Sequence, residues 1–355
     1  MGTGIAGQLL YNFPYPARWL RICGEIIGLV AGIEFVVFTI LFISRFILYP
    51  EQHRRMMDHN GQSMFLGCIP MALATVTSMI YSVWREKAWI PCYVLWWIDV
   101  IISLICGWWV VFYMFARQKR TTDGINLTIL LPVVPLVVAS TEGVFIAHEQ
   151  PEGLRASSAI VSLLLWANGV AVAVSCMVIY LHRMLLHNLP PAAITFSALL
   201  AVGPLGQGSA GIQHIGEIVA DCLSRQGKPE GLVLASKYAG TGVGMCMLGY
   251  GVFWIVICIF SVIELKPRKF NMSWWALTFP MGVYANGWTK LSVDLDITAL
   301  KVIACVLIVL EVLAMLMCTA CSLYLGIFRS DLFEAAHKET GRDDFDDDLK
   351  AKMMV

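Results

Sequence analysis

The side chains best placed for chemistry lie on one face of an apolar segment near the C-terminal end of the chain. Four residues follow one another at steps of three, four and four, the spacing of one helix face: Phe279, Gly282, Asn286 and Lys290. An amide and an ammonium group on such a face can bind an anion, and an aromatic ring can close a narrow lumen by filling it and excluding water. The predicted chemistry is therefore non-covalent. Phe279 is interpreted either as a gate or as an ordinary packed ring.

The pattern of an apolar segment, a proline and then small residues occurs four times. The prolines are Pro70, Pro135, Pro204 and Pro280. A proline within a membrane helix frees a carbonyl and opens a kink, and small neighbours let another group approach the backbone. Of the residues directly before these prolines, only Phe279 is aromatic. We therefore predict kinked helices around a shared path, which these further residues line: Thr75, Thr77, Ser140, Thr141, Glu142, Gly203, Gln207, Ser209 and Thr278.

The predicted path carries no fixed positive charge deep in the apolar segments. Lys290 comes late in its segment, so we expect it at a mouth of the path, where a cation attracts anions. Further in, an anion would meet hydroxyls, an amide and helix dipoles. Neutral donors of this kind suit passage better than tight capture.

Acidic residues inside apolar segments are candidates for function. Glu142 lies seven residues after Pro135 and is expected to face the path. It would either carry a proton coupled to transport or form a bond between helices. For the other four, we expect pairing within the bundle or a subunit interface: Glu25, Glu34, Asp99 and Glu311.

The sequence contains short motifs that resemble those of enzymes, but each lacks neighbouring residues that the chemistry requires. GQGSAG at 206–211 matches a dinucleotide-binding fingerprint, but it lies inside an uncharged apolar segment without the required strand and acidic residue. Ser209 lacks the preceding glycine of a nucleophile elbow. His148, His182, His187 and His214 show no ligand spacing with one another. We therefore expect no enzyme activity, no cofactor and no metal site.

Composition defines the broad class. Hydrophobic residues make up 58% of the 355 residues, charged residues 14%, and the mean hydropathy is +0.71. A soluble domain carries roughly a quarter charged residues, so this is an integral membrane protein. The zero net charge argues against nucleic acid as a partner.

Apolar runs predict nine complete membrane helices and one half helix at 1–11. The half helix resembles the part of the other segments that follows the proline, so we expect its first half to be missing from the given sequence. Segments rich in proline and small residues alternate with bulky apolar segments. The predicted fold is all-α, with ten transmembrane segments as five helical hairpins around a central pore. Inner helices form the pore, and outer helices face lipid.

The predicted transmembrane domain covers 1–328, and a soluble acidic tail covers 329–355. Lysine and arginine are balanced ten against ten between the two sets of short loops. Basic residues in the tail break the tie and place it in the cytoplasm. The tail has few apolar residues, so we expect it to be disordered.

Several motifs resemble the tellurite-resistance/dicarboxylate transporter family, which includes fungal sulfite efflux pumps, malate permeases and plant slow anion channels. They are MGTGI at 1–5, LGCIPMALATVTSMI at 66–80, GPLGQGSAGI at 203–212 and WWALTFPMGVYA at 274–285. GPLGQG and NFPYPARWL most resemble the sulfite efflux branch. The resemblance implies a homotrimer with one pore in each subunit, and it places the pore-closing phenylalanine of the family at Phe279.

The resemblance implies a plasma-membrane exporter of sulfite or bisulfite. Two alternatives keep the fold: a transporter of malate or another dicarboxylate, and a gated anion channel. A dicarboxylate would favour two cationic or strong donor sites along the pore, and the sequence indicates only Lys290.

Overall fold

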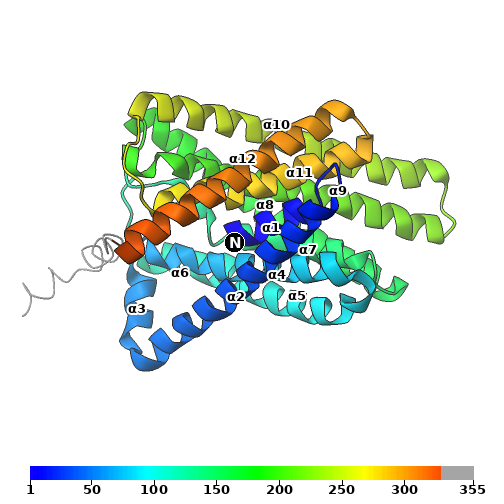
Figure 1. Ribbon diagram of the computed structural model, residues 1–355, viewed down its shortest axis with the longest axis horizontal. Coiled ribbons are helices and arrows are strands. Elements are labelled where there is room, and N and C mark those ends of the chain that lie inside the picture. Colours follow the sequence, from blue (N-terminus) through cyan, green and yellow to red (C-terminus); the bar gives the residue numbers. More distant parts are fainter. Residues whose placement is uncertain (329–355) are drawn as a thin grey trace, which may run out of the picture.

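The computed structural model describes residues 1–328, and all regular secondary structure in this range is helical. The long helices are α2 (Arg18–Leu48), α8 (Glu152–His187), α10 (Glu230–Leu265) and α12 (Thr298–Leu323). In Figure 1, α8 and α10 run along the long axis of the molecule, whereas α2 and α12 cross it obliquely. The predicted tail at 329–355 lies outside the described residues.

Shorter elements complete the bundle. The α-helices are α1 (Gly2–Tyr11), α3 (Glu51–Asp58), α4 (Cys68–Trp84), α5 (Trp89–Leu104), α6 (Val111–Arg117), α7 (Val134–Ala147), α9 (Val202–Arg225) and α11 (Phe279–Leu295). Short 3₁₀ segments are η1 (Gln62–Gly67), η2 (Arg85–Lys87), η4 (Leu127–Leu130), η5 (Ala192–Ala201) and η6 (Met272–Leu277). Two π-helical segments are η3 (Ile105–Val110) and η7 (Tyr324–Phe328).

Six helical stretches in the described chain are long and apolar enough to cross a membrane. Their outward faces carry large apolar side chains, for example Leu29, Phe112, Leu164, Phe260 and Leu313, each more than half exposed. Water would penalise so much exposed apolar surface, whereas lipid would not. The protein is therefore a multi-pass membrane protein.

The proline segments are broken rather than kinked. Each begins with a 3₁₀ turn, and a new α-helix then begins in which the proline is the second or third residue: Pro70 in α4, Pro135 in α7, Pro204 in α9 and Pro280 in α11. A proline in a helix interior loses a hydrogen bond and clashes with the carbonyl four residues earlier. In the first turn it does neither. The predicted kinked helices are therefore corrected to short α-helices that begin inside the bundle.

Five of the helices form a closed ring. The ring follows the order α1, α4, α7, α9 and α11, each in contact with the next, and α11 returns to α1. The contact between α9 and α11 is close because Gly206 has no side chain: a Cβ there would lie 2.3 Å from the Cα of Tyr284. The long helices pack outside the ring, with α2 on α1, α8 on α7, α10 on α9 and α12 on α11.

Two of the acidic residues expected to pair or to lie at an interface are buried inside this single chain. Asp99 of α5 and Glu311 of α12 are fully buried, and none of their carboxyl oxygens has a hydrogen-bond partner among residues 1–328. Glu311 points inward, because a Cβ on Gly282 of α11 would meet it at 3.3 Å. Their burial within one chain is at odds with a subunit interface for these two residues. Glu25 of α2 is exposed.

Candidate functional site

Two cavities lie in the bundle, with volumes of about 590 Å³ and 810 Å³. Among the described residues they share two lining side chains, Thr75 of α4 and Phe279 at the start of α11. Phe279 is 5% exposed. Pro280 favours the start of a new helix, and Phe279, the residue before it, is the first residue of α11.

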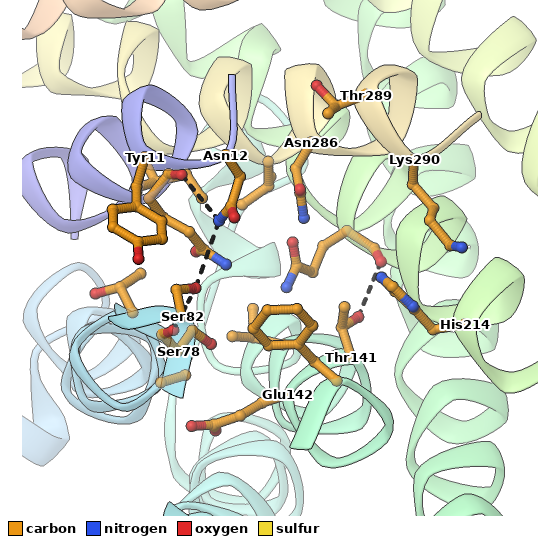
Figure 2. Close-up of a pocket in the computed structure, with 18 of the residues that line it drawn as sticks. Tyr11, Asn12, Ser78, Ser82, Thr141, Glu142, His214, Asn286, Thr289 and Lys290 are labelled. Atoms are coloured by element: carbon orange, nitrogen blue, oxygen red, sulfur yellow. Dashed lines mark hydrogen bonds between the residues drawn. The ribbon is translucent and has the colours of Figure 1, made fainter. Parts of the chain in front are cut away.

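The first cavity, which we call the polar cavity, is lined by hydroxyl, amide and charged groups. Figure 2 shows side chains of α4, α7, α9 and α11 around it, together with residues at the end of α1. Its polar lining includes Tyr11, Asn12, Ser78, Ser82, Thr141, Glu142, Gln207, His214, Asn286, Thr289 and Lys290. The hydroxyl and amide groups in this lining can donate hydrogen bonds to an anion.

The second cavity, which we call the apolar cavity, also has Phe279 in its lining. Its lining is mostly aliphatic and aromatic and includes Phe35, Phe38, Phe42, Phe65 and Trp275. Gly203 and Thr278, both predicted path residues, also line it. Glu34 of α2 lines this cavity as well.

The structure divides the predicted path residues into three groups, of which Gly203 and Thr278 in the apolar cavity are one. Seven line the polar cavity: Thr75, Thr141, Glu142, Gln207, Phe279, Asn286 and Lys290. Seven line neither cavity: Pro70, Thr77, Pro135, Ser140, Pro204, Ser209 and Gly282.

The hydroxyls away from the cavities bond to carbonyls. Ser140 donates to the carbonyl of Ser162 on α8 at 2.7 Å, and Ser209 donates to that of Gly244 on α10 at 2.9 Å. Thr77 donates to a carbonyl of its own helix at 3.1 Å. A buried hydroxyl in a membrane must find a partner inside the protein. These side chains therefore join inner to outer helices or bond within a helix.

Thr141 shows how the ring is held together beside the polar cavity. Its Oγ1 lies 2.9 Å from the carbonyl oxygen of Gln207, which connects α7 to α9 (Figure 2). The side-chain oxygen Oε1 of Gln207 has no hydrogen-bond partner in the described chain. The Gln207 amide is therefore incompletely bonded at the wall of the cavity.

Several lining residues were missed by the sequence interpretation. Ser78 and Ser82 follow Thr75 at steps of three and four on α4, so helical periodicity could have found them. Asn12 lies at the end of α1, and its Nδ2 donates to the Oγ of Ser82 at 3.4 Å. No local pattern indicates that contact, because its partners are 70 residues apart.

Lys290 is not the free cation that the sequence suggested. Its Nζ lies 2.7 Å from Glu217 Oε2 and 2.7 Å from Asp294 Oδ1, so two carboxylates offset its charge. Two exposed arginines line the same cavity, Arg21 of α2 and Arg85 at the end of α4. Neither has an ion-pair partner in the described chain. The cations available to an anion at this mouth are therefore the two arginines.

Glu142 lines the polar cavity, yet it is 2% exposed. Neither of its carboxyl oxygens has a hydrogen-bond partner in the described chain. A buried carboxylate without donors is costly, whereas the protonated acid costs much less. Because Glu142 is buried and also lines the cavity, it is placed to release a proton to the cavity and to take one up from it.

The polar cavity borders a cluster of three potential ligands. His148 Nε2 and His214 Nδ1 lie 3.4 Å apart, and Glu217 Oε2 is 3.9 Å and 3.7 Å from them. The fold thus brings together two histidines that are 66 residues apart, and this corrects the expectation that they cannot share a site. Burial lowers the pKa of His148, in the turn after α7, so the neutral ring is favoured.

A helical bundle with lipid-facing outer helices and cavities within it is typical of membrane transporters and channels. Residues 1–323 match the family described as "SLAC1: Voltage-dependent anion channel", and the chain belongs to this family. The predicted tellurite-resistance/dicarboxylate transporter relationship is thereby confirmed.

Individual relatives agree with this assignment. The chain is 32% identical to "Sulfite efflux pump SSU1" of Arthroderma benhamiae over 302 residues, 83% of this chain and 80% of the relative. It is 27% identical to the protein of the same name from Saccharomyces cerevisiae, covering 83% and 78%. "Malic acid transport protein" of Schizosaccharomyces pombe is 22% identical, covering 81% and 67%.

Proposed function

We propose that this protein exports sulfite or bisulfite across the plasma membrane, with Phe279 as the gate between the two cavities. The observation that carries the proposal is the position of Phe279, whose side chain lines both cavities. The sulfite efflux pumps among the relatives support the cargo. A small oxyanion needs several weak donors and a closable constriction; the hydroxyl and amide groups of the polar cavity support the first, and the shared position of Phe279 supports the second.

The route runs through the ring of inner helices. In this proposal the chain crosses the membrane ten times as five hairpins, with α1, α4, α7, α9 and α11 inside. The closed ring of contacts between these helices supports this arrangement. We place the residues after α12 in the cytoplasm, so the apolar cavity, which Leu323 lines, faces the cytoplasm. The polar cavity then faces outward. The family resemblance supports a homotrimer with one path in each subunit.

The ring of Phe279 closes this route by exclusion of water. An anion in the apolar cavity keeps its hydration shell, and a phenyl ring at a narrow point leaves no room for that shell. When the ring moves aside, the anion reaches Thr75 and Gln207, which replace lost water with hydrogen bonds. Arg21 and Arg85 then draw it toward the mouth.

A dicarboxylate such as malate is the second candidate cargo. One observation favours it: Arg21 and Arg85 give the polar cavity two cationic groups, and a molecule with two carboxylates can use both. The malic acid transport protein among the relatives agrees with this candidate. A gated anion channel is the third, and it differs in that flux follows the electrochemical gradient alone.

Reconstituted vesicles separate these candidates. Purified protein is placed in liposomes loaded with sulfite or with malate, and efflux of each is measured against protein-free liposomes. Faster efflux of sulfite than of malate supports the first proposal. Malate efflux without sulfite efflux contradicts it. A membrane potential set with a potassium gradient drives a channel in either direction, whereas a proton-coupled carrier also responds to a pH gradient.

A further inference from the structure

Three potential metal ligands meet beside the polar cavity, and the anion path described above does not require them. They are His148 in the turn after α7 and His214 and Glu217 on α9. His214 and Glu217 are three residues apart, so they share one face of the helix. All three side chains are partly exposed, with 35%, 16% and 34% accessible surface respectively, so an ion can reach them from water.

The distances between the ligand atoms fit a zinc ion. Zinc binds histidine nitrogen and carboxylate oxygen at about 2.0–2.2 Å, so two ligand atoms in a tetrahedral site lie roughly 3.4 Å apart. The nitrogens of His148 and His214 are 3.4 Å apart, and each is 3.9 Å or less from Glu217 Oε2. Movements of a few tenths of an ångström complete three corners of a tetrahedron. The fourth corner stays open for water or an anion.

Neighbouring groups hold these ligands in place. Arg155 of α8 donates to the carbonyl oxygen of His148 at 2.9 Å and is paired with Asp221 of α9, so it fixes the turn against that helix. Lys290 shares Glu217 Oε2 but also has Asp294 at 2.7 Å. Lys290 therefore keeps Asp294 as its ion-pair partner when Glu217 binds a metal ion. A carboxylate bonded by a second group in this way is common around zinc.

We infer that His148, His214 and Glu217 bind a zinc ion, and that the bound ion slows anion passage at this mouth. His214 and Lys290 also line the polar cavity, so the ion lies at its wall. Its open corner faces anions as they leave. A divalent cation there holds an anion longer than Arg21 or Arg85 does. The binding claim stands without the proposed transport function, whereas the effect on flux rests on it.

Calorimetry with Zn²⁺ on the purified full chain tests binding directly. We expect one ion per chain for the natural protein, and Co²⁺ at the same site should give the intense visible absorption of tetrahedral coordination. His214→Ala and Glu217→Gln each remove one ligand. Loss of an outer-shell partner weakens metal binding roughly 10- to 100-fold, so removal of a ligand should exceed that range. His182→Ala, on the exposed face of α8, is the matched control and should bind as before.

The inference is overturned if the natural protein binds no zinc, or if His214→Ala and Glu217→Gln bind it as tightly as the natural protein. Glu217→Gln keeps the side-chain volume, so it guards against a folding defect in the alanine variant. Zinc added outside liposomes should slow efflux from the natural protein several-fold and leave His214→Ala unaffected. Equal slowing of both would contradict the effect on flux. Absence of any flux would count against the proposed function and leave the binding result intact.

Discussion

The ammonium of Lys290 lies 2.7 Å from Glu217 Oε2, and this ion pair joins α11 to α9 at the wall of the polar cavity. Asp294, one turn along α11, holds the same ammonium at 2.7 Å. Lys290 and Asp294 are 11% and 6% exposed. Lys290 is thus a structural cation between two carboxylates, and its position at a mouth does not make it an anion receptor.

Lys290→Ala should therefore lower stability. Removal of the ammonium leaves two carboxylates close together, one of them nearly buried, and an uncompensated buried charge costs on the order of 1–3 kcal/mol. Thermal unfolding in detergent measures this as a lower midpoint. Adding Asp294→Asn to the variant should restore part of the loss.

Lys301→Ala is the matched control, since its pair with Asp296 is at the surface and an exposed pair contributes little. Equal midpoints for Lys290→Ala and the natural protein would contradict the structural role.

Arg21→Gln and Arg85→Gln should each slow anion efflux a few-fold. The two side chains are exposed at the polar cavity, so they act on the anion across water, and salt screens such an interaction. Efflux from liposomes at low and at high ionic strength is the measurement. The difference between variant and natural protein should shrink as salt rises. Lys87→Gln, an exposed cation that lines neither cavity, should behave like the natural protein. A defect that salt leaves unchanged would refute electrostatic attraction.

Glu142→Gln should flatten the dependence of efflux on pH. Glu142 is buried at the cavity without a hydrogen-bond partner, so the acid form avoids a large cost that the carboxylate would bear. Asp99 and Cys92, both of α5, are the titratable groups that interact with it. Efflux rates between pH 5 and 8 measure the effect.

Glu311→Gln provides the comparison for Glu142→Gln, since Glu311 is buried but does not line the cavity. It should keep the slope of the natural protein. An unchanged slope in Glu142→Gln would assign Glu142 a purely structural role.

Much of the polar cavity could be predicted from helical spacing within α11. Phe279, Asn286 and Lys290 share a face, and all three line this one cavity. Gly282 belongs to the same pattern, but it lies about 60° around the helix from Phe279. Gly282 does not line the cavity, and a Cβ there would meet Ile5 of α1 at 2.7 Å and Glu311 of α12 at 3.3 Å. The spacing thus identified the face of α11 that lines the cavity, but it did not show how far around the helix this face extends.

Contacts between distant segments could not be predicted. His148 and His214 meet because α7 packs against α9, and nothing in the local sequence of either fixes that packing. The same holds for Arg21 and Arg85, which reach one cavity from α2 and the end of α4. The spacing of His214 and Glu217 on α9 was available in the sequence, but it indicates a site only once a third ligand is known.

The gate at Phe279 is tested most directly by efflux from liposomes that contain Phe279→Ala. If the ring closes the route between the cavities, its removal should raise sulfite efflux at least about tenfold. Phe279→Leu, which keeps an apolar plug, should lie between the two. Phe35→Ala, in the apolar cavity alone, should stay near the natural rate. Efflux through Phe279→Ala no faster than through the natural protein, with both equally folded by thermal unfolding, would contradict the gate.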